Sequence, residues 1–120
     1  PAAPPAPPPE PPPPAFEPQL LRLSDILGSV TALSEVCRDE VTAALPDGGA
    51  ETWRRKMRDL MEAEGQSAGQ RERLAGAFNQ GYQGYATSYR FCTASARLAL
   101  ERLLREGARL ADEVLGRFGT

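Results

Sequence analysis

Apolar residues recur at helical spacing along most of the chain, after a proline-rich beginning. From Pro18 onward they return every three or four positions, which is the period of an amphipathic helix. No segment alternates apolar and polar residues with a period of two, so the pattern predicts helices and no strands. The expected helices span residues 18–37, 50–64, 69–92 and 94–118, and residues 38–44 could add a short extra turn.

Residues suited to helix ends support these boundaries. Pro18 fits the first turn of a helix, where a missing backbone N–H is not needed. Thr93 is a good N-cap for the last helix. Leu45 to Glu51 contains Pro46, Gly48 and Gly49 and is therefore expected to form a loop.

Four amphipathic helices with mostly short links favour an all-α fold, an up-down-up-down four-helix bundle. Residues 18–120 are enough for one domain with its own core. In this topology the first and third predicted helices run in the same direction, so their C-terminal ends meet at one pole.

Residues 1–17 have a different character. Most of the 12 prolines lie in this segment, where each fixes φ and removes a backbone donor. We expect a disordered, extended stalk that tethers the domain. A role as a ligand for a proline-reading partner is the alternative.

The two cysteines, Cys37 and Cys92, fall at the ends of the two predicted helices that share a pole. Pattern and topology together predict a disulfide between them, which would mainly be structural. Two buried thiols in a cytosolic protein, or one reactive thiol, are the alternatives.

Composition narrows the classes of function. The chain has no His, which removes the commonest general base and metal ligand, and we expect no enzyme activity, no cofactor and no metal site. With 14 basic and 16 acidic residues, the net charge of −2 argues against nucleic-acid binding. No apolar stretch is long enough for a membrane span. Met57 and Met61 make a poor copper site without His and are expected in the core.

The chain begins at Pro1 rather than Met. We expect that a signal peptidase removed an export signal, although removal during preparation of the chain would leave the same start. Together with the predicted disulfide, this indicates a periplasmic protein.

The run FNQGYQGYATSYRFCT, residues 78–93, carries the most individual residues of the chain. Gly81 and Gly84 sit inside a predicted helix, where glycine costs up to about 1 kcal/mol relative to alanine. Close approach of a neighbouring helix is one explanation. The other is a binding face, whose candidate residues are Asn79, Gln80, Tyr82, Gln83, Tyr85 and Arg90.

This run, together with Cys37, Trp53 and the final segment EGARLADEVLGRFG, resembles a family of small exported alphaproteobacterial proteins known only as a domain of unknown function. The resemblance covers about residues 18–119 and leaves out the proline-rich stalk. It implies a periplasmic location and brings no activity or catalytic residue.

The expected function is therefore binding of another envelope protein, or modulation of an envelope process, by a non-enzymatic helical protein. A small-ligand carrier that uses Tyr82, Tyr85 and Arg90 is the alternative; in it Arg90 would pair with an anionic group of the ligand.

Overall fold

A computed structural model of the chain describes residues 3–44 and 48–118, and every regular element in this part is a helix. Residues 45–47 of the predicted loop lie outside the described residues, as do the first two residues of the stalk and the last two of the chain. The predicted all-α fold class is confirmed for the described part, and the extra turn at residues 38–44 forms a separate short helix. The helices are α1 (Glu17–Val36), α2 (Arg38–Ala44), α3 (Ala50–Glu64), α4 (Ala68–Ser88) and α5 (Ala94–Phe118).

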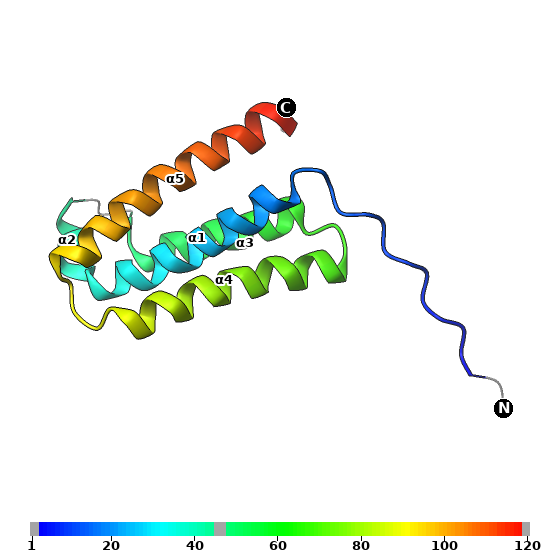
Figure 1. Cartoon of the computed structure of the whole chain (residues 1–120), viewed down its shortest axis with the longest axis horizontal. Coiled ribbons are helices and arrows are strands. Elements are labelled where there is room, and N and C mark those ends of the chain that lie inside the picture. The colour runs from blue at the N-terminus through cyan, green and yellow to red at the C-terminus, as the bar shows by residue number, and fades with distance from the viewer. Residues whose placement is uncertain (1–2, 45–47, 119–120) are drawn as a thin grey trace.

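Helix α1 is the centre of the molecule (Figure 1). Helices α3, α4 and α5 each pack on α1, and in the described part of the chain they pack only weakly on one another. Helices α1 and α4 run in one direction while α3 and α5 run in the other (Figure 1). The closed four-helix bundle remains a prediction, because in the described residues one helix provides the shared packing surface.

The sequence of α1 suits this central position. Its apolar residues would cover only one side, yet Ser24, Ser29 and Thr31 are also buried. Each hydroxyl donates a hydrogen bond to the backbone carbonyl four residues earlier, at 2.9, 2.9 and 2.6 Å. Because their polar groups are satisfied within the helix, these small side chains can face other helices at little cost.

Two glycines set the spacing of α1 and α4. A Cβ atom on Gly28 would lie 2.9 Å from the backbone nitrogen of Tyr82, and one on Gly81 would lie 2.6 Å from Oδ1 of Asp25. Close approach of a neighbouring helix therefore explains Gly81. It does not explain Gly84, where an added Cβ would meet nothing within 4 Å.

The core has two parts along α1. Met57 is buried in the second of them and Met61 packs against it, so both methionines belong to the core, as expected. The first part, nearer the disulfide, contains Ile26, Val30, Leu33, Cys37, Val41, Ala96, Leu100 and Leu103. The second contains Leu20, Leu27, Met57, Leu74 and Val114.

The third predicted helix ends early, at Ser88 instead of residue 92. The hydroxyls of Thr87 and Ser88 donate to carbonyl oxygens within the last turn, and Tyr89 is extended, with φ −122° and ψ 104°. This break frees the chain to carry Cys92 back to α1. Thr93 then caps α5 as predicted, since its hydroxyl accepts from the N–H of Ala96 at 3.1 Å.

The proline-rich segment leaves the helices as an extended stretch of chain (Figure 1). Its Glu10 contacts the start of α4, where Oε1 accepts a hydrogen bond from the N–H of Gly69 at 2.7 Å. A carboxylate is favourable at this position because the first N–H groups of a helix lack partners.

Candidate functional site

The predicted disulfide is present. Cys37 follows α1 and Cys92 lies in the loop before α5, with a Cα–Cα distance of 4.9 Å. A carboxylate oxygen of Glu40 lies within 4.8 Å of both sulfurs, but Glu40 pairs with Arg97 and the oxidised sulfurs offer no thiolate to a metal. The bond therefore serves to join the end of α1 to the loop between α4 and α5.

In the structure, the residues of the predicted binding face have different surroundings. Asn79, Gln80 and Gln83 are exposed on α4, and helical spacing places them together on the side away from α1. They form an open patch of amides. Tyr82 and Tyr85 are half-buried at the edges of the α1–α4 contact.

Tyr82 joins three helices through charged groups. Its hydroxyl donates a hydrogen bond to Oε2 of Glu35 in α1 at 3.0 Å, and Arg54 of α3 donates to the other oxygen of Glu35. The guanidinium of Arg54 also lies 5.7 Å from the centre of the Tyr82 ring. The hydrogen bond to Glu35 raises the pKa of Tyr82 above its usual value, with burial adding to the effect.

Tyr85 and Arg90 have other surroundings. Tyr85 stacks on Tyr89 with ring centres 5.8 Å apart and packs against the first part of the core, while Arg90 is exposed in the loop after α4. Among the described residues, Tyr82, Tyr85 and Arg90 therefore have no contact in common.

On the α5 side, Arg22 donates two hydrogen bonds to Glu106, at 2.7 and 2.8 Å. This pairing raises the pKa of Arg22 and lowers that of Glu106. The ion pair fixes α5 to α1 on the surface of the molecule.

The contribution of Tyr82 to stability should depend on pH. Because its folded-state pKa is raised above the usual value near 10, the hydrogen bond to Glu35 is fully available below pH 10 and is lost as the pH rises through the raised pKa. We expect Tyr82→Phe to lower the free energy of unfolding by about 1 kcal/mol at pH 8, with this difference shrinking above pH 10. Urea unfolding of both proteins across this range measures it.

Tyr89→Phe is the control for that comparison, since the Tyr89 hydroxyl has no hydrogen-bond partner among the described residues. A Tyr82→Phe difference that stayed constant from pH 8 to pH 11 would contradict the role assigned to the bond with Glu35.

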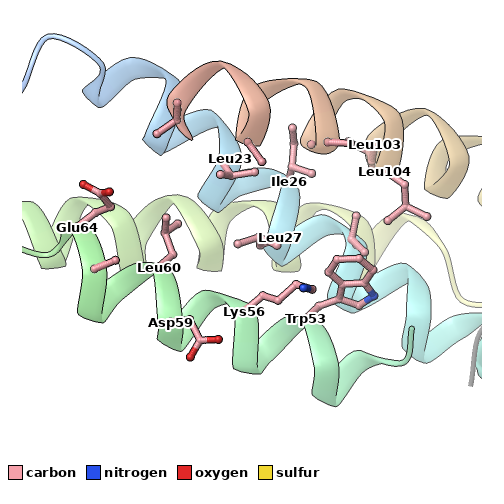
Figure 2. Close-up of a pocket in the computed structure, with 16 residues that line it drawn as sticks. Leu23, Ile26, Leu27, Trp53, Lys56, Asp59, Leu60, Glu64, Leu103 and Leu104 are labelled. Carbon is pink, nitrogen blue, oxygen red and sulfur yellow. The ribbon is translucent and has the colours of Figure 1, made fainter. Parts of the chain in front are cut away.

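An apolar groove of about 550 Å³ lies between α3 and α5. Figure 2 shows side chains of α3 and α5 on its two sides and Leu23, Ile26 and Leu27 of α1 between them. The remaining apolar lining comes from Val30, Trp53, Leu60, Ala63, Leu103, Leu104, Gly107, Ala108, Ala111 and Val114.

Small residues keep this groove open. Gly107, Ala108 and Ala111 line it from α5, and Ala63 lines it from α3. A Cβ atom on Gly107 would lie 3.2 Å from Cγ2 of Ile26, so this glycine allows α5 to pack closely on α1, while the alanines leave the space between α3 and α5 unfilled. In the sequence, Gly107 and Ala111 belong to the ordinary apolar stripe of the last predicted helix, and a small residue in such a stripe does not indicate a groove.

The polar groups of the groove all come from α3. Lys56 reaches back over Trp53, with its Nζ atom 5.9 Å from the ring centre, while Asp59 and Glu64 lie along the same helix (Figure 2). The α5 wall is apolar. The groove can therefore bind an apolar surface, with charges along one edge.

No helix in the described part of the chain is long and apolar enough to cross a membrane. Neither the curated proteins nor the solved structures contain a significant match to the chain. The resemblance to a family of unknown function is confirmed, because the family described as "Protein of unknown function (DUF2385)" matches residues 15–118. The chain therefore belongs to this family of proteins of unknown function.

Proposed function

We propose that this chain is a non-enzymatic periplasmic binding protein that holds another envelope protein in the groove between α3 and α5. The observation that supports this proposal is the groove itself, a space of about 550 Å³ lined by apolar residues of three helices. A concave space of this volume with apolar walls is a common form of binding site. Binding, rather than catalysis, also fits a chain without His.

The remaining features give this binding protein a scaffold and a location. The Cys37–Cys92 disulfide supports an oxidising compartment such as the periplasm. The four long helices would act as one up-down-up-down unit, and the proline-rich segment would tether it. The exposed amides Asn79, Gln80 and Gln83 provide a second surface for the same partner.

Photo-crosslinking in the native cell tests the groove as the binding site. A photoreactive residue in place of Ala108, which lines the groove, should form an adduct with another protein that mass spectrometry can identify. The same residue in place of Ala94, which is exposed at the start of α5 and does not line the groove, should not. Equal labelling from both positions, or no protein adduct from Ala108, would argue against this proposal.

Filling the groove should separate binding from stability. We expect Ala108→Leu combined with Ala111→Leu to raise the free energy of unfolding by about 1 kcal/mol, because the new methyl groups bury apolar surface against α3. The same variant should lose the partner found by crosslinking. A more stable protein that still binds normally would place the partner elsewhere, and Ala94→Leu is the control with the same type of substitution outside the groove.

A small-ligand carrier is the second candidate, and the volume of the groove favours it. A space of about 550 Å³ falls within the range of sites for small molecules. The ligand would then be apolar and would lie in the groove instead of beside Tyr82, Tyr85 and Arg90. Extraction of the purified protein with organic solvent, followed by mass spectrometry, would detect such a ligand.

A further inference from the structure

The groove has the length of a short helix. On α3 it extends from Trp53 to Glu64, and on α5 from Leu103 to Val114. At 1.5 Å per residue, each wall is about 16 Å long, which corresponds to about three turns of a helix lying along it. An amphipathic helix would present an apolar stripe of matching length.

The walls also allow a helix backbone to come close. Packed helices lie about 8–10 Å apart, and small residues at the contact favour the shorter distances. Two such residues, Ala108 and Ala111, line the α5 side. The floor is firm because Ile26 and Val30 are almost completely buried there. A helix in the groove would thus rest on preformed packing surfaces of α1, α3 and α5.

Charge distinguishes the possible occupants. The charged residues lining the groove are Lys56, Asp59 and Glu64, so the edge formed by α3 has two acids and one base. The base is held back over Trp53 at one end. A fatty acid or an anionic phospholipid would bring a negative head group to an edge with net negative charge. A helix with basic residues beside its apolar stripe would be complementary to Asp59 and Glu64.

We propose that the groove binds an amphipathic helix of another protein, about three turns long, with lysine or arginine side chains facing Asp59 and Glu64. This inference rests on the proposed function and specifies the chemistry of the partner. The partner would bind as a helix in a groove, and its apolar side chains, spaced three, four and seven residues apart, would face the groove.

Trp53 provides the measurement, because it is the single tryptophan of the chain and lines the groove. Two probes are used, both amphipathic peptides of about 14 residues without tryptophan and with the same leucine stripe. One carries lysines beside the stripe and the other glutamates. We expect the basic peptide to shift the Trp53 emission and to bind about tenfold more tightly at physiological salt.

Charge reversal supplies the specific test. Asp59→Lys combined with Glu64→Lys should remove or reverse the preference for the basic peptide. The matched control is Glu62→Lys combined with Glu113→Lys, which changes the net charge equally at exposed residues of α3 and α5 that do not line the groove. This control should keep most of the preference.

The outcomes separate this inference from the proposed function. If both peptides bind equally, or if both double variants change the preference alike, the inference that the partner helix is basic is wrong. A protein adduct from position 108 would still support the proposed binding of another protein. If myristate shifts the Trp53 emission and neither peptide does, the occupant is an acyl chain and both proposals fail. If sedimentation shows a dimer that protects Trp53 from a quencher, a second copy of the chain covers the groove and the inference is overturned.

Discussion

Removing both cysteines, by Cys37→Ala combined with Cys92→Ala, is expected to lower the free energy of unfolding by about 4 kcal/mol. The bond closes a loop across 55 positions, and in the simple chain-entropy treatment this restriction of the unfolded chain accounts for the effect. A domain of this size is stable by only about 5–15 kcal/mol, so the variant should unfold at much lower urea concentration. Urea unfolding followed by circular dichroism measures the change.

The wild-type protein in reductant is the natural comparison for that variant. Its unfolding midpoint should fall to nearly the same urea concentration, because both proteins lack the covalent link. Cys37 is almost fully buried, but alanine removes only its sulfur atom and leaves a small cavity. The main loss of stability should therefore come from the bond. A decrease below about 1 kcal/mol would show that the unfolded chain is already restricted without the disulfide.

The second large effect is expected at the contact between α1 and α4. Gly28→Ala should lower the free energy of unfolding by about 3 kcal/mol, because its Cβ would meet backbone atoms of Phe78 and Tyr82 in α4. Backbone atoms cannot turn away as a flexible side chain can, so the two helices must separate. Gly81→Ala should act similarly, since its Cβ would meet the carbonyl oxygen of Asp25. Thermal and urea unfolding of each variant test both.

Gly84 and Gly76 offer the matched controls on α4. An added Cβ at either position meets no atom within 4 Å, so alanine should stabilise the helix by about 0.5–1 kcal/mol through lower backbone entropy in the unfolded chain. Opposite signs for Gly81→Ala and Gly84→Ala are the decisive result. If both alanines stabilise the protein, the helices are not held at the distance that the structure gives.

Local pattern was sufficient to predict the helices. The apolar period predicted the helix over residues 50–64 to the residue, and the capping role of Thr93 followed from the chemistry of its hydroxyl. The end of α4 was harder to predict, because Tyr89 and Cys92 continue the helical spacing of apolar residues after the helix has ended at Ser88. Their spacing reflects contacts with the core made from the loop, which periodicity cannot distinguish from a further helical turn.

The sequence of α4 alone predicted only part of the surroundings of the candidate binding face. Asn79, Gln80 and Gln83 are exposed together because they share one side of α4. Tyr82 and Tyr85 are drawn to different neighbours, Tyr82 to Glu35 and Tyr85 to Tyr89. Glu35 lies on α1, so residues 78–93 alone could not identify the partner of Tyr82, whereas the contact of Tyr85 with Tyr89 lies within this run.

The sequence by itself determined the helical class, the range of most helices and the pairing of Cys37 with Cys92, because these depend on local spacing and on the direction of successive helices. Only the tertiary structure decided which helix is central and where the groove lies. In sequence, the serines and threonine of α1 look like a solvated side, and the alanines of α5 look like core. The serines and the threonine are buried and Ala108 is exposed because of where α3, α4 and α5 lie around α1, and this placement is a property of the packed helices together.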